Sequence, residues 1–156
     1  MRLLLHHFPD PKTVFEACIR VLKPGGQLIA NEVDAFLGIW YPPDPVMQEF
    51  QDFCLFLQQR VGIDPYLGRK LFSMFREYGM QDIHVHLIPD LMIGEPEPAN
   101  LENVQILMQN WKELLAEHFG SNNSPDFVGR LLAYLQRDDI MTCSNLFLTG
   151  GRKPNS

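Results

Sequence analysis

Cysteine, excess positive charge and long hydrophobic runs are all scarce in this 156-residue sequence. Its three cysteines, Cys18, Cys54 and Cys143, are odd in number and far apart, without a Cys-x-x-Cys pair, which is typical of a reduced, cytoplasmic protein. The formal net charge of -6 disfavours a nucleic-acid partner, because there is no basic field to attract phosphates. No stretch approaches the ~20 apolar residues that a membrane span needs, so no membrane partner is expected.

The segment around residues 13–33 contains the clearest structural pattern. Apolar residues from Val14 to Leu22 recur at helical spacing, which predicts a helix with one apolar stripe. Pro24 cannot continue that helix, and Gly25 and Gly26 can adopt the positive φ that closes a helix end. The following residues, Gln27 to Val33, are predicted to form a buried strand.

The remaining sequence alternates helix and strand patterns, which indicates an α/β protein. Residues 34–44 are rich in aromatic residues and proline, which is typical of a loop or lid over a pocket. The further expected elements are helices at 45–61, 67–78, 100–118 and 127–137, a half-exposed strand near a sheet edge at 81–88, a loop beginning at Pro89, and a final strand at 141–150.

Two motifs in a fixed order resemble a known family. The run Leu4–Pro11, a helix, and then Leu22–Gly26 with a strand ending at Glu32 are similar to the middle of a class I S-adenosylmethionine-dependent methyltransferase, in its small-molecule (type 11/12-like) branch. The later run Asp64–Leu71 and the segment Tyr78–Ile83 fit that family's next helix and strand, so the resemblance covers nearly the whole chain.

The resemblance implies only part of the family's fold. Its glycine-rich cofactor loop precedes the Leu-His-His segment, whereas here that segment starts near Met1 and no Gly-x-Gly occurs. The expected architecture is thus the C-terminal half of a Rossmann-like, doubly wound domain with about three strands, the last antiparallel and inserted between the other two. Residues 1–156 would form a single partial domain, with 34–66 and 89–137 as acceptor-side insertions.

This half-domain would leave the apolar strand at 27–33 at an open sheet edge. Such an edge tends to pair with another chain. We therefore expect either a homo-oligomer or a partner that supplies the complementing N-terminal half.

The resemblance also suggests site residues near the N-terminus. His6 and His7 correspond to the segment after a strand that borders the cofactor, and a histidine side chain titrates in the range that suits a general base. The alternative is that one packs under the sheet and the other is solvated. Arg2 is the candidate for contact with S-adenosylmethionine, and an ordinary surface arginine is the alternative.

Acceptor-binding candidates follow the predicted strand. Glu32 and Asp34 come at its expected carboxyl end, where open α/β sheets bind ligands. Trp40 and Tyr41 could form an apolar lid, and Arg69 could face an anionic acceptor. For each of these residues a purely structural or solvated role is the alternative.

Two histidines later in the chain invite a metal-site hypothesis. His84 and His86 place two imidazoles on one face of a strand, but no further ligand cluster accompanies them, so no metal is predicted.

Two function classes remain open. The first is S-adenosylmethionine-dependent methyl transfer to a small-molecule acceptor, with the chain inactive alone because the cofactor loop is missing. The second is a non-catalytic interaction module, a methyltransferase remnant that acts by pairing with itself or with another protein.

Overall fold

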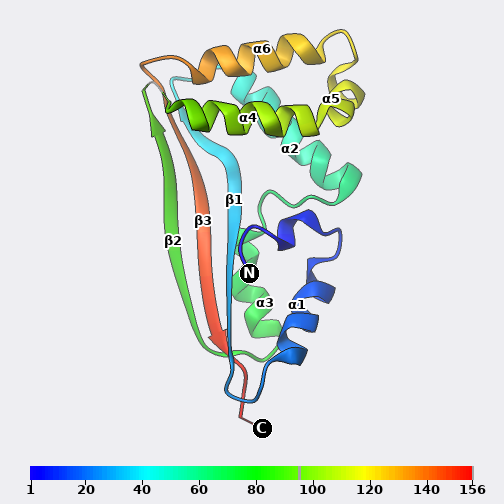
Figure 1. Ribbon diagram of the computed structural model, residues 1–156, viewed down its shortest axis with the longest axis vertical. Coiled ribbons are helices and arrows are strands. Elements are labelled where there is room, and N and C mark those ends of the chain that lie inside the picture. Colours follow the sequence, from blue (N-terminus) through cyan, green and yellow to red (C-terminus); the bar gives the residue numbers. More distant parts are fainter. Residues whose placement is uncertain (95, 156) are drawn as a thin grey trace. The chain divides into compact units, whose positions relative to one another are not determined.

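The computed structural model describes residues 1–94 and 96–155. Its elements in chain order are η1 (Leu5–His7), α1 (Pro11–Val21), β1 (Gln27–Tyr41), α2 (Pro45–Val61), η2 (Gly68–Lys70), α3 (Leu71–Glu77), β2 (Gln81–Ile93), α4 (Pro98–Asn110), α5 (Lys112–Phe119), α6 (Ser124–Leu135) and β3 (Met141–Arg152). The strands form a sheet in the order β1-β3-β2, with β3 running opposite to its two neighbours (Figure 1). The predicted α/β class and the insertion of the last strand between the other two are confirmed.

The chain forms two compact units. Unit 1 contains Met1–Phe36, Gln58–Asp90 and Ser144–Ser156, and unit 2 contains Leu37–Leu57 and Leu91–Cys143. Each of the three strands contributes residues to both units.

Unit 1 packs α1 and α3 against the same face of its part of the sheet (Figure 1). Phe15 from α1 and Phe75 from α3 are fully buried, and their ring centroids lie 4.9 Å apart. Leu28 and Ala30 of β1 complete this core from the sheet. The apolar stripe predicted for α1 is therefore what holds the helix on the sheet, since burial of apolar surface is the main stabilising term.

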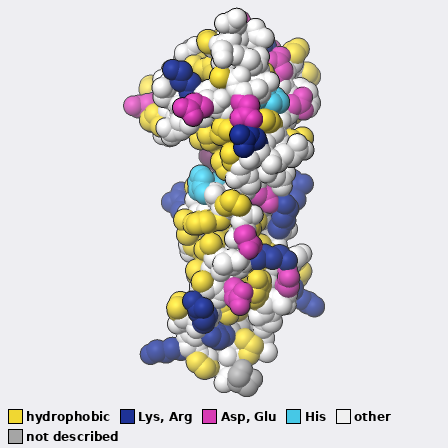
Figure 2. All heavy atoms as spheres, turned by 90° about the vertical axis from the view of Figure 1, so that its right-hand side faces the viewer, with side chains coloured by type: hydrophobic (Ala, Val, Ile, Leu, Met, Phe, Trp, Pro, Cys, Tyr) yellow, Lys and Arg dark blue, Asp and Glu magenta, His cyan; other side chains and the backbone are white. Residues whose placement is uncertain are grey.

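The surface of unit 1 carries charges of both signs beside exposed apolar side chains such as Val21 and Ile29. Lys12 forms an ion pair with Glu77 at 2.7 Å, with both side chains about half exposed. Basic and acidic side chains are interspersed on the face that Figure 2 presents.

Unit 2 has an aromatic core built from α2, α5 and α6. Phe53 lies 5.8 Å from Trp111 and 5.9 Å from Phe119, measured between ring centroids, and Phe119 stacks on Phe127 at 4.2 Å. The Tyr134 hydroxyl donates a hydrogen bond of 2.9 Å to the carbonyl of Pro42. The expected helices at 45–61 and 127–137 are thus present as α2 and α6, with the predicted apolar faces buried.

The prediction of a loop after Val33 was wrong, because β1 continues to Tyr41. The aromatic residues in this stretch favour a strand as much as a lid. Two non-glycine residues with positive φ, Ala35 (62°) and Leu37 (46°), interrupt the regular geometry without ending the strand. At Ala35 the backbone N–H leaves the sheet and donates to the carbonyl of Pro65 at 2.7 Å. Glu32 and Asp34 therefore lie within β1 and not at its carboxyl end.

The edge of β1 is also different from the expectation. The backbone N–H of Leu3 donates to the carbonyl of Asn31 at 2.7 Å, and the N–H of Asn31 donates to the carbonyl of Met1 at 3.0 Å. Arg2 and Asn31 form a parallel bridge. The edge predicted to be open is thus covered at this point by the chain's own first residues.

Two more boundaries differ from the sequence pattern. β2 extends five residues past Ile88 to Ile93 and includes Pro89, which an edge strand tolerates. The single helix expected over 100–118 is divided at Trp111, whose side chain is buried beside Phe53. The apolar spacing of the sequence could not predict this break, because the contact joins residues far apart in the chain. Within residues 1–94 and 96–155, no helix has the length and hydrophobicity to cross a bilayer.

Candidate functional site

Glu32 connects β1 to the N-terminal segment of unit 1. Its side chain is fully buried, and its Oε1 accepts hydrogen bonds of 2.9 Å from the backbone N–H groups of Leu4 and Leu5. Its Oε2 lies 2.7 Å from Nδ1 of His6, which is 3% exposed. Both carboxylate oxygens are therefore used to hold η1, whose first N–H groups would otherwise lack partners.

The contacts of Glu32 also determine the tautomer of His6. Burial alone raises the pKa of Glu32, but the hydrogen bonds from His6, Leu5 and Leu4 outweigh it, and the net effect lowers that pKa. An ionised carboxylate only accepts hydrogen bonds, so Nδ1 of His6 must carry the proton that it donates. A neutral His6 then keeps its lone pair on Nε2.

His7 lies beside His6, with the two ring centroids 3.9 Å apart, and it is exposed. Partial burial and the neighbouring His6 lower the pKa of His7, whereas the carboxylate of Glu32 opposes them. A lowered pKa keeps the imidazole neutral at pH 7, and a neutral imidazole can accept a proton. The two histidines therefore take the arrangement given above as the alternative, one buried and one exposed to solvent.

Asp34 and Arg69 form a second polar pair in unit 1. Nε of Arg69 donates to Oδ1 of Asp34 at 2.7 Å, and Nη2 donates to Oδ2 at 3.0 Å. The Asp34 side chain is 6% exposed and the Arg69 side chain 57%. The carboxylate thus fixes one side of the guanidinium, and the other side faces solvent.

Gly68 allows this pair to form. A Cβ at that position would lie 2.9 Å from Cβ of Asp34 and 2.9 Å from the carbonyl oxygens of Glu32 and Val33. Only glycine leaves room for η2 to approach the backbone of β1 this closely.

Asp64 organises the segment between α2 and η2, and sequence reasoning did not identify it. Its backbone N–H donates to the carbonyl of His6 at 3.0 Å, and its carboxylate accepts from Tyr66, Gln58 and, at 2.6 Å, from Nζ of Lys70. The one available signal was the Asp-Pro pair, which is typical of a turn in which the aspartate accepts local N–H groups. Asp64 thereby joins the histidine segment to the turn that carries Arg69.

The other three predicted site residues are Arg2, Trp40 and Tyr41, none of which takes part in the hydrogen bonds described above. Arg2 is exposed and sits where the N-terminal segment pairs with Asn31. Trp40 and Tyr41 are the last residues of β1 and belong to unit 2, with Tyr41 64% exposed. Unit 1 brings together the five remaining candidates, namely His6, His7, Glu32, Asp34 and Arg69.

The described residues contain no group of three or more His, Cys, Asp or Glu side chains that could hold a metal ion. His84 and His86 lie on β2, where both are exposed.

Comparisons by sequence and by fold both find similarity to methyltransferases. Residues 1–30 match the family model of a methyltransferase domain. No curated protein matches the chain. Among solved structures, a candidate methyltransferase from Bacillus halodurans is 20% identical with a TM-score of 0.56, and the match covers 98% of this chain and 62% of that one. The YcgJ protein from Bacillus subtilis is 16% identical with a TM-score of 0.53, over 99% of this chain and 62% of that one.

A third structure is phosphoethanolamine N-methyltransferase 2 from Haemonchus contortus, in complex with phosphomonomethylethanolamine and S-adenosylhomocysteine. It is 19% identical with a TM-score of 0.48, over 98% of this chain and 32% of that one. The chain therefore spans less than two thirds of the length of each of these proteins. Its fold and the sequence of its first thirty residues confirm the predicted resemblance to class I S-adenosylmethionine-dependent methyltransferases.

Proposed function

We propose that this chain provides the acceptor side of an S-adenosylmethionine-dependent methyltransferase that acts on a small molecule. The observation that carries the proposal is the link between the matched segment and the sheet. Residues 1–30 match the methyltransferase model, and Glu32 binds that segment through Leu4, Leu5 and His6. Such a link holds His6 and His7 in one position relative to β1.

The residues of this chain fit the acceptor side and not a complete cofactor site. No Gly-x-Gly occurs in the sequence, and Arg2 is the one candidate for a cofactor contact. We therefore propose that a further polypeptide segment supplies the cofactor cradle, and that the 156 residues alone do not transfer methyl groups. S-adenosylmethionine, when bound, would supply the electrophilic methyl group.

In this proposal His7 is the general base. It would take the proton from an acceptor hydroxyl or amine, which suits an exposed imidazole with a lowered pKa. His6 and Glu32 are positioning residues, because both are buried and bound to each other. A fixed neighbouring ring restricts the orientations that His7 can adopt.

Arg69 is the proposed anchor for the acceptor. Asp34 takes the N–H of Nε and one N–H of Nη2, which leaves both N–H groups of Nη1 and the second of Nη2 for a polar or anionic oxygen of the acceptor. Asp34 thereby orients the anchor without contacting the acceptor.

The first test is calorimetric titration of the purified chain with S-adenosylmethionine. We expect no binding at micromolar concentration from a folded sample. Micromolar binding by the chain alone would contradict the proposed division of the site.

The second test uses the coding DNA upstream of the first codon. An in-frame strand with a Gly-x-Gly loop would define a longer polypeptide, whose methyl-transfer activity would be assayed against small-molecule acceptors. We expect His7→Gln to remove the low-pH limb of kcat/KM, where His7 becomes protonated, and Arg69→Gln to raise KM. Arg69→Lys is the matched control for charge. A longer polypeptide that binds no S-adenosylmethionine would contradict the proposal.

One observation favours the second function, an interaction module. β2 is exposed along most of its length, and its apolar side chains include Val85 at 40%, Leu87 at 56% and Ile88 at 41% exposure. Exposed apolar side chains on an edge strand favour pairing with a partner. Sedimentation analysis tests this function, since it predicts a dimer that Leu87→Lys would dissociate.

A further inference from the structure

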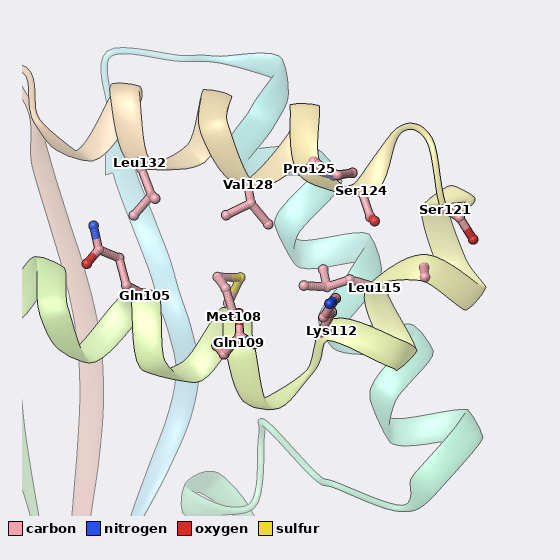
Figure 3. Close-up of a pocket in the computed structure, with 11 residues that line it drawn as sticks. Gln105, Met108, Gln109, Lys112, Leu115, Ser121, Ser124, Pro125, Val128 and Leu132 are labelled. Atoms are coloured by element: carbon pink, nitrogen blue, oxygen red, sulfur yellow. The ribbon is translucent and has the colours of Figure 1, made fainter.

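A cavity of about 580 Å³ lies in unit 2 between α4, α5 and α6 (Figure 3). Every residue that lines it comes from these three helices or from the turn between α5 and α6. Its volume falls in the range of small-molecule sites, about 300–1,000 Å³. The cavity shares no residue with the Glu32 and Arg69 network of unit 1.

The walls of the cavity are mainly apolar. Figure 3 shows Met108 on α4 pointing toward Val128 on α6, with Leu132 one turn further along α6 pointing in the same direction. Leu115 of α5 lines the end near the turn. Met108 and Leu115 are buried, whereas Val128 and Leu132 are partly exposed because the cavity leaves their surfaces uncovered. An elongated apolar ligand would cover these surfaces.

The cavity has few polar groups, and the charge among them is positive. Lys112 is the only charged residue in the lining, which contains no Asp or Glu. In the part of the chain that the structure describes, the Lys112 ammonium has no ion-pair partner. Ser124 is 8% exposed, and Figure 3 shows its hydroxyl directed toward the space between α5 and α6. That hydroxyl has no hydrogen-bond partner among residues 1–94 and 96–155, so it is available to a ligand that enters the cavity.

We propose that this cavity binds an amphipathic carboxylate, with its apolar chain between Met108, Val128 and Leu132 and its anionic head near Lys112 and Ser124. Covering the apolar walls would stabilise the complex, because it removes apolar surface from water. The unpaired ammonium and the hydroxyl would select a negative head group over a neutral one. The inference does not rest on methyl transfer, because it requires neither cofactor nor any residue of unit 1.

The test compares decanoate with decanol in calorimetric titrations of the whole chain. We expect decanoate to bind at least about tenfold more tightly than decanol, since a hydrogen bond to a charged group is stronger than one between neutral groups. Lys112→Gln should remove this difference by weakening decanoate alone, and Lys112→Arg should preserve it. Val128→Trp should abolish the binding of both ligands by filling the cavity.

A second readout locates the ligand. In spectra of ¹³C-methyl methionine, decanoate should shift the Met108 signal, assigned with Met108→Leu, and leave that of Met74 in the core of unit 1 unchanged. The proposal is overturned if decanoate does not bind, if Lys112→Gln changes decanoate and decanol alike, or if a folded Val128→Trp protein still binds both.

Discussion

Among the residues that the structure describes, the three buried carboxylates, Glu32, Asp34 and Asp64, all belong to unit 1, whereas unit 2 packs aromatic rings into its core beside a cavity that Lys112 lines. In unit 1 every one of these carboxylates accepts hydrogen bonds on both oxygens. In unit 2 the packing is between rings such as Phe119 and Phe127. Unit 1 therefore adds specific buried polar contacts to its apolar core, whereas the packing of unit 2 depends mainly on filled volume.

The same difference separates the two candidate sites. Glu32 and Asp34 are occupied by the protein's own donors, which leaves the outward-facing side chains of His7 and Arg69 for chemistry. In the cavity of unit 2, Lys112 and Ser124 have no such partners within the described part of the chain, so their donors are available to a ligand. In unit 1 the buried carboxylates hold neighbouring side chains in position. In unit 2 the polar groups of the cavity are available to bind a ligand.

The largest effect is expected from Glu32→Gln. The change removes the charge that holds His6 and replaces an acceptor with a donor, and breaking a buried pair costs about 3–5 kcal/mol. Urea unfolding followed by circular dichroism measures the loss. The exposed Glu102→Gln on α4 is the matched control and should change the free energy of unfolding by less than about 0.5 kcal/mol. If the two substitutions lowered the free energy of unfolding equally, the buried carboxylate of Glu32 would have no special role in the stability of unit 1.

A pair of glycine substitutions should give effects of opposite sign. Gly68→Ala places a Cβ 2.9 Å from two carbonyl oxygens of β1, and overpacking of this kind costs about 1–3 kcal/mol. Gly129→Ala on α6 meets nothing within 4 Å and should stabilise the protein by about 0.5–1 kcal/mol through helix propensity. Thermal unfolding of both variants makes the comparison. A Tm that rises for Gly68→Ala would contradict the close approach of η2 to β1.

Two aspartate substitutions compare ion pairs in the two units. Asp34→Asn weakens a pair whose carboxylate is 6% exposed, with an expected loss of about 1.5 kcal/mol for a charge-assisted bond. Asp126→Asn weakens the ion pair between Asp126, which is 71% exposed, and Arg130, which is 44% exposed. This substitution should cost less than about 0.5 kcal/mol. Unfolding in low salt and in 1 M NaCl tests this order, because salt should reduce the second effect more. Equal losses would show that burial does not distinguish the two pairs.

The smallest effect is a dependence on pH that belongs to unit 1. The pKa of His7 is lowered in the folded chain, so below its ordinary value of 6.5 the unfolded chain binds the proton more readily. Stability is therefore complete above that value and decreases as the pH falls toward the folded pKa. His7→Gln should flatten this slope in unfolding free energies measured from pH 7 to 5. An unchanged slope would assign the pH dependence to other groups.

The periodicity of the sequence was sufficient for most of the helices, and the order of the sheet was implied by the family resemblance. Helices with a clear apolar stripe, such as Pro11–Val21 and Pro45–Val61, lie close to or at their predicted bounds. Local pattern failed where the strand geometry depends on distant partners. β1 passes through two positive φ values at Ala35 and Leu37, and the first of these is accompanied by a hydrogen bond to Pro65 that no local pattern contains.

For the candidate site, residue type identified which side chains could do chemistry, and the tertiary structure decided which are accessible. His6, Glu32 and Asp34 were reasonable candidates as titratable groups beside a predicted strand, but long-range hydrogen bonds bury them and occupy their oxygens or ring nitrogen. Asp64 had only a turn signal, because its partners at His6 and Lys70 are set by the fold. By itself the sequence determined the α/β elements and the resemblance, since periodicity and motifs are local. The exposure of each side chain, its hydrogen-bond partners and the cavity of unit 2 depend on residues far apart in the chain, and only tertiary packing brings those residues together.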